Sequence, residues 1–280
     1  MTPTTSRRSI LAGIAVGTVA GVAGCLADGR EVEESVTERR SAADLSAVAV
    51  STAIGDVTVR PTSRDDVIVD GRKAAVSPDD LETIGLETTT NGDCLELTVK
   101  RDESRTLFGL RPVPVLDLSV AVPERLAVQS VETRTGKIDV SDVRGDLTAV
   151  TETGDVRAEA IDGTVSATTK AGAIDLVDPA SIELLETDSG DVTATLPDIE
   201  RDATIETSSG DVELRLPDEL DLTLDITTDS GEITVSDVAA LPEMAGDSLI
   251  EAVVGQGTHR LEVRTVTGNV TVTGRERSNE

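Results

Sequence analysis

Three aspartates share one position of a repeated motif and are the residues best placed to do chemistry. Asp155, Asp191 and Asp211 each directly follow a glycine in copies of that motif. If the copies stack as strands about 5 Å apart, these carboxylates would offer Ca²⁺ the oxygen ligands it prefers. However, Ala173 interrupts the series, and aspartate after glycine is also good turn chemistry. The sequence favours structural corners and leaves a cation site as the weaker alternative.

Residues that would support catalysis are few. His259 is the only histidine, and nothing in the sequence marks an oriented partner or a pocket for it. No nucleophile elbow, P-loop, paired-cysteine zinc motif or dinucleotide fingerprint is present. We therefore predict a non-enzymatic protein with no catalytic residue and no cofactor.

The alternative is a polysaccharide lyase or hydrolase, because acidic residues on stacked β-strands can cleave glycosidic bonds. Such enzymes usually present aromatic platforms to the sugar, whereas this chain has no Trp and no Tyr. The composition therefore favours a binding or structural role over this enzyme class.

The candidate residues lie within seven copies of one pattern: Thr, any residue, a small residue, Gly, any residue, then Val or Ile. Successive copies are 18, 18, 18, 20, 21 and 37 residues apart. A repeat of strand-forming residues at a nearly fixed period indicates stacked structural units. The copies begin at Thr133, Thr151, Thr169, Thr187, Thr207, Thr228 and Thr265.

Apolar residues stand two positions before each Thr and two after each Gly, which is the alternation of half-buried strands. The Thr alternates in step with the apolar residues, so its side chain should also point inward. We expect these hydroxyls to form a ladder of hydrogen bonds to neighbouring repeats or to the backbone. The Gly marks a corner. We predict an all-β fold, a parallel β-solenoid preceded by a less regular β N-terminal cap.

The chain divides into four parts. Residues 1–25 form a signal peptide with a lipobox, and residues 26–44 form a charged tether. Residues 45–125 form the N-terminal β cap, and residues 126–275 form the repeats. An insertion at residues 236–260 interrupts the repeats and is where we expect a binding face to project.

The first 25 residues predict the location of the protein. Arg7 and Arg8 resemble a twin-arginine export signal, and the stretch ending Gly24-Cys25 resembles a lipobox. Acylation of Cys25 would hold the protein on the extracellular face of the cell membrane. The apolar stretch from Ile10 to Gly24 is 15 residues long, short for a membrane span of about 20. An uncleaved anchor is the alternative.

With Cys25 acylated, Cys94 has no partner for an internal disulfide. We expect it to be a buried, inert thiol.

The charge is strongly acidic. Asp and Glu number 53 against 25 Lys and Arg, for a formal net charge of −28. Molar salt shortens the Debye length to about 3 Å and relieves such self-repulsion, so the composition resembles that of a haloarchaeal protein. Nucleic acid is excluded as a partner by the same charge.

Units such as Thr151-Glu152-Thr153-Gly154-Asp155-Val156 resemble those of the putative-adhesin β-strand-repeat family, a domain of unknown function. The resemblance covers roughly residues 47–273. It implies an adhesin-like role and no catalytic residues. A long repetitive β-surface anchored outside the cell likewise predicts a role in adhesion or envelope organisation, with contact to the membrane through the lipid anchor at Cys25 and to a cell-surface or envelope partner.

Overall fold

The computed structural model describes residues 29–102 and 112–274, apart from positions 198, 218, 240 and 243. Arg7, Arg8 and Cys25 lie outside the described residues, so the export signal and the lipidation site stay predictions. Within the described part, the one helix is α1 (Pro78–Leu81), a single turn capped by Ser77. None of the described residues forms a helix long and apolar enough to cross a membrane. Over the described residues, the prediction of an all-β fold is confirmed.

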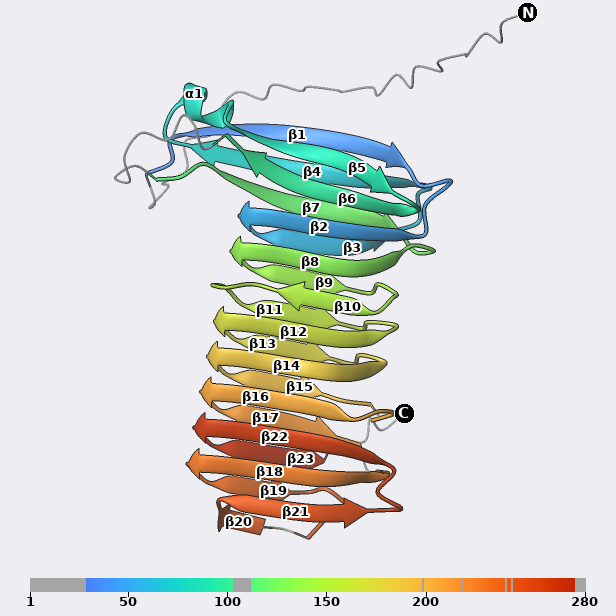
Figure 1. The fold of residues 1–280 in the computed structure, drawn as a ribbon, viewed down its shortest axis with the longest axis vertical. Helices are drawn as coiled ribbons and strands as arrows, with labels where there is room; N and C mark the ends of the chain where they lie inside the picture. The colour runs from blue at the N-terminus through green and yellow to red at the C-terminus, as the bar shows by residue number, and fades with distance from the viewer. Residues whose placement is uncertain are drawn as a thin grey trace, which may run out of the picture.

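The strands form two sheets that face each other (Figure 1). In spatial order, the described strands of the twelve-stranded sheet are β1 (Val32–Ser41), β4 (Asp66–Ala75), β7 (Val115–Pro123), β3 (Val57–Thr62), β9 (Ile138–Ser141), β11 (Val156–Glu159), β13 (Ile174–Val177), β15 (Val192–Thr195), β17 (Val212–Leu216), β23 (Val270–Gly274), β19 (Ile233–Ser236) and β20 (Met244–Asp247). Those of the eleven-stranded sheet are β21 (Leu249–Val254), β18 (Leu222–Ser230), β22 (His259–Thr267), β16 (Ala203–Ser209), β14 (Ser181–Ser189), β12 (Thr164–Ala171), β10 (Leu147–Val150), β8 (Ala127–Thr135), β2 (Ala47–Ile54), β6 (Cys94–Arg101) and β5 (Ile84–Asn91).

One aliphatic core fills the space between the sheets. In β17, Val212, Leu214 and Leu216 are buried, whereas Arg215 between them is exposed. Buried residues of both sheets belong to a single cluster. The side chains alternate as the sequence predicts, and the parallel pairing of the repeat strands fits a β-solenoid.

The rungs do not follow the chain order. We use "rung" for a strand of the eleven-stranded sheet together with the next strand of the other sheet. The last rung, β22 and β23, lies between the rung β16/β17 and the rung β18/β19. Val270 accordingly pairs with Val212 on one side and with Ile233 on the other.

The insertion at residues 236–260 differs from the expected projecting segment. It forms β20 and β21, which pair antiparallel with β19 and β18 and close this end of the stack. Capping satisfies backbone groups that the terminal rung would otherwise leave unpaired, which explains why the segment is drawn into the sheets.

The N-terminal end is built in the same way. The rung β2/β3 lies between β6/β7 and the first regular rung, β8/β9. The tether predicted for residues 26–44 is wrong for residues 32–41, because this segment forms β1 and pairs antiparallel with β4 along its whole length. Its charged residues suit an edge strand, where one face and one side remain in water.

Candidate functional site

The glycines of the repeat stack directly on one another at one edge of the molecule. A Cβ built on Gly154 would lie 2.0 Å from the carbonyl oxygen of Gly136, one rung away. The same replacement on Gly172 would meet the oxygen of Gly154 at 2.0 Å. Only glycine permits this approach, and Gly154 also has a φ of +144°, which L-residues rarely adopt. The repeat therefore requires glycine for close stacking of the corners.

Beside the glycines, the threonines of the motif form the predicted ladder. Each hydroxyl donates to the carbonyl oxygen of the corner glycine in the adjacent rung, so a buried polar group is satisfied by backbone. This part of the sequence prediction is confirmed. The bonds are Thr133 to Gly55 (3.2 Å), Thr151 to Gly136 (3.2 Å), Thr169 to Gly154 (3.0 Å), Thr187 to Gly172 (3.0 Å), Thr207 to Gly190 (3.0 Å), Thr265 to Gly210 (3.1 Å) and Thr228 to Gly268 (2.9 Å).

Replacing Thr207 with valine tests this ladder. The change removes the buried hydroxyl and leaves the Gly190 carbonyl without its bond, so we expect a loss of about 1–2 kcal/mol in unfolding free energy. Chemical denaturation in molar salt measures it. Thr204→Val, on the outward face of the same strand, is the matched control and should change stability by no more than about 0.5 kcal/mol. Equal losses in the two variants would contradict the ladder's role.

The candidate aspartates belong to a second ladder on the outer side of these corners. Each side-chain oxygen accepts a hydrogen bond from the backbone N–H at the same position of the next rung. Lys137 and Ala173 occupy two positions of this column and have no acceptor to offer. The bonds are Asp117 Oδ1 from Asp56 N (3.0 Å), Asp56 Oδ1 from Lys137 N (2.8 Å), Asp155 Oδ1 from Ala173 N (3.1 Å), Asp191 Oδ1 from Asp211 N (2.9 Å), Asp211 Oδ1 from Asn269 N (2.7 Å) and Asn269 Oδ1 from Glu232 N (3.1 Å).

This arrangement leaves little for a cation. Asp155, Asp191 and Asp211 each use one carboxylate oxygen on a backbone amide, and the second oxygen of Asp155 lies 3.2 Å from Lys137 Nζ. Among the described residues, no group of three or more His, Cys, Asp or Glu side chains could hold a metal ion. The three carboxylates act as caps between rungs.

The ladder predicts a contribution of Asp155 to acid stability. The backbone N–H of Ala173, with Lys137 assisting, holds the pKa of Asp155 below its usual range against the opposing effect of partial burial. Because the folded pKa is lowered, this stabilisation is present above about pH 4 and is lost as the pH falls through the folded value. We expect Asp155→Asn to flatten the stability profile in that range. Denaturation from pH 6 to pH 3 measures it, and Asp188→Asn, an exposed aspartate on β14, should follow the wild type.

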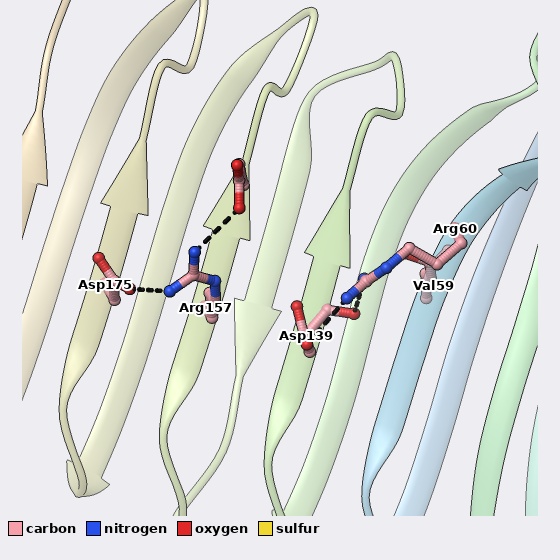
Figure 2. Close-up of polar contacts among 6 residues, drawn as sticks. Val59, Arg60, Asp139, Arg157 and Asp175 are labelled. Atoms are coloured by element: carbon pink, nitrogen blue, oxygen red, sulfur yellow. Dashed lines mark hydrogen bonds and ion pairs between the residues drawn. The ribbon is translucent and has the colours of Figure 1, made fainter.

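The outer face of the twelve-stranded sheet carries ion pairs between neighbouring strands (Figure 2). Arg60 Nη2 lies 2.9 Å from Asp139 Oδ2, and its Nη1 donates to the carbonyl oxygens of Val59 and Asp139. Arg157 of β11 reaches Asp175 of the neighbouring β13 at 2.5 Å and Glu159 of its own strand at 2.9 Å. These arginines are partly exposed, so the pairs fix the spacing of surface side chains more than they stabilise the fold.

A surface hollow of about 450 Å³ lies over β1, β4, β7 and β3, and its acids already have hydrogen-bond or ion-pair partners. Within it, Thr37 donates to Asp70 at 2.7 Å, and Arg72 lies 3.8 Å from Asp117. These contacts hold both carboxylates in place and occupy oxygens that a general acid or base would need to keep free for a substrate.

The two remaining candidates lie apart from the corners. His259 is the first residue of β22 and pairs with Leu222 of β18. Cys94, predicted to be buried, is instead half-exposed, because it is the first residue of β6 at the end of a hairpin. Partial burial, Glu96 and Asp93 raise the pKa of the thiol, so little reactive thiolate forms at neutral pH, and low reactivity stays a prediction.

Asp221 is a structural residue that the sequence pattern did not single out. Its Oδ1 accepts from the backbone N–H of Gln256 at 2.7 Å, and its Oδ2 accepts from the Thr258 hydroxyl at 2.9 Å. These bonds fix the turn between β21 and β22, and they lower the pKa of Asp221. The motif gave no signal for it because Asp221 precedes β18 and reaches a turn 35 residues later in the chain.

Known proteins of similar structure include three bacterial ones of low sequence identity. A putative adhesin from Parabacteroides distasonis has 13% identity and a TM-score of 0.45, over 86% of this chain and 97% of that chain. A putative adhesin from Bacteroides fragilis has 11% identity and a TM-score of 0.42, over 85% and 97%. A putative cell adhesion protein from Clostridium sporogenes has 10% identity and a TM-score of 0.38, over 87% and 100%.

The comparison with curated protein sequences finds no match. A comparison with protein families does find a match: residues 177–273 match the Toastrack DUF4097 family. These residues include the strands β16 to β23, whose order in space differs from their order in the sequence.

Proposed function

We propose that this chain is a non-enzymatic cell-surface lipoprotein, a rigid β-solenoid that serves adhesion or envelope organisation. The observation that carries the proposal is the elongated stack of strands (Figure 1), with β1 at one end and β20 and β21 at the other. Eleven strand spacings of about 4.8 Å make it roughly 50 Å long. An anchor at Cys25 would place the β20/β21 end farthest from the membrane.

The polar residues of the stack support a binding role over an enzymatic one. Corner aspartates cap backbone amides, inward threonines bond to glycine carbonyls, and arginines of the outer face pair across strands. Catalysis needs acids and bases free to exchange protons with a substrate. The corner aspartates, inward threonines and paired arginines instead hold the rungs together.

The proposed anchor predicts a specific pattern of mislocalisation. Replacing Arg7 and Arg8 with lysine should leave unprocessed precursor in the cytoplasm, because the export signal depends on the arginine pair. Replacing Cys25 with serine should release the exported protein from the membrane, because no thiol remains to be acylated. Cell fractionation and mass spectrometry of the N-terminus measure both. Unmodified Cys25 on a chain that retains Met1 would favour the uncleaved anchor instead.

The functional experiment is deletion of the gene followed by measurement of surface attachment and biofilm in high salt. We expect attachment to fall and to be restored by the wild-type gene, but not by the Cys25→Ser variant. Purified protein should be screened in parallel for cleavage of surface glycans. Normal attachment together with glycan turnover that is lost on mutating a few acids would reverse the assignment and make the chain a polysaccharide-active enzyme.

A further inference from the structure

The strand that ends the eleven-stranded sheet, β21, is unlike the rest of the surface. It pairs with β18 on one side and has no strand of the described chain on the other (Figure 1). Leu249 is 55% exposed and Val253 is 70% exposed, and they are the exposed large hydrophobic residues of the described part. Both lie on the outward face of this one edge strand, with Glu251 between them.

The backbone of β21 is also available on that edge. The Ser248 carbonyl accepts from Thr228 N–H at 3.0 Å, so the residues of even number point their backbone groups toward β18. In antiparallel pairing the next residues point the other way. Leu249, Glu251 and Val253 therefore direct their N–H and C=O groups outward, as the free side of a further strand pair.

The opposite end of the molecule is protected in the usual manner. There, β1 carries charged residues along its length, and β5 ends in threonines and asparagine. Charged and polar edges disfavour further pairing. The contrast indicates that the β21 end, unlike the β1 end, is suited to accept another strand.

We propose that β21 pairs antiparallel with β21 of a second copy of this chain, joining two stacks end to end. A two-fold axis through Glu251 sets Leu249 opposite Val253 of the second copy, and Ile250 opposite Ala252. The exposed apolar residues then meet on the outer face, and buried Ile250 and partly buried Ala252 continue the core on the inner face. The segment is self-complementary in this register, which favours a second copy over an unrelated strand. The pairing itself does not depend on the proposed function.

The same register makes the joint dependent on salt. It places Glu251 directly opposite Glu251 of the second copy, and like charges in that position oppose pairing. Each chain also has a formal net charge of −28, which repels the other. Molar salt screens both effects. The two copies should separate at low salt and associate at high salt.

Light scattering after size-exclusion chromatography tests the association with the full chain. The mass should correspond to one chain in about 0.1 M salt and double in molar salt. Glu251→Gln should dimerise at lower salt than the wild type, and Val253→Lys should remain a monomer throughout. Thr204→Lys, on an outward face in the middle of the sheet, is the matched control and should behave as the wild type.

Disulfide trapping tests the register. With Cys25 and Cys94 replaced by serine, Glu251→Cys should give a cross-linked dimer in molar salt, because paired strands bring the two Cα atoms to about 5.5 Å. Glu87→Cys, on the edge strand β5 at the other end, should give none. The proposal is overturned if the protein is a monomer at every salt concentration and residue 251 gives no cross-link. A strand of another protein would then be the remaining candidate for pairing with this edge. If deletion of the gene reduced attachment while the purified protein stayed a monomer, this inference would fail and the proposed function would stand.

Discussion

Replacing Gly154 with alanine is expected to destabilise the fold by about 3 kcal/mol or more. The added Cβ would lie 2.0 Å from the Gly136 carbonyl oxygen, and the clash is with backbone, which cannot rotate away. Overpacking of this kind costs about 1–3 kcal/mol, and a left-handed φ adds a similar amount of strain. Thermal and chemical unfolding in molar salt measure the loss.

Gly85→Ala is the matched control for this prediction. Gly85 lies in the edge strand β5, and a Cβ there would have no heavy atom within 4 Å. Its replacement should leave stability unchanged or slightly raised, since alanine restricts the unfolded chain. If Gly154→Ala were as stable as Gly85→Ala, close stacking of the corners would not be what the repeat requires.

Replacing Val263 with aspartate is expected to disturb two rungs that are far apart in sequence. Val263 is fully buried in β22 and pairs with Ile205 of β16 and Ile226 of β18. A carboxylate there must be desolvated or protonated, at a cost of several kcal/mol. Hydrogen exchange should show lost protection in both β16 and β18.

Arg264→Gln, at the next position of β22 but on the outward face, is the control. Arg264 Nη2 lies 3.9 Å from Asp229 Oδ2, and both side chains are well exposed. The replacement should therefore lower the free energy of unfolding by less than about 0.5 kcal/mol. Loss of protection confined to one side of β22 would contradict the interior position of the last rung.

The repeat was predictable because its chemistry is local. Each Thr and Gly bonds to or stacks on its counterpart in an adjacent rung, so a motif of six residues carries the information for the corner. Asp155, Asp191 and Asp211 occupy a column that the motif reveals, although their partners, the backbone amides of the next rung, become visible only in the structure.

The order of the rungs was not predictable from the motif. Thr228 bonds to Gly268, and Thr265 bonds to Gly210, but either threonine would fit either glycine. The signal was the step of 37 residues between the last two copies, which is long enough to build β20 and β21 and return. Charge likewise concealed β1, because the polarity that predicts a tether for residues 32–41 also suits an edge strand.

The interior position of the last rung also governs when the protein can finish folding. Residues 259–274 leave the ribosome after β16 to β21 have been made, yet they lie between β16/β17 and β18/β19. The stack therefore cannot grow rung by rung during synthesis, because the place between β16 and β18 stays open until β22 has been made. Closure joins strands far apart in sequence, so it should be the slow step of folding. Once closure is made, the last strands of the described chain, β22 and β23, have a neighbour on both sides, so the structure cannot unravel from them one rung at a time.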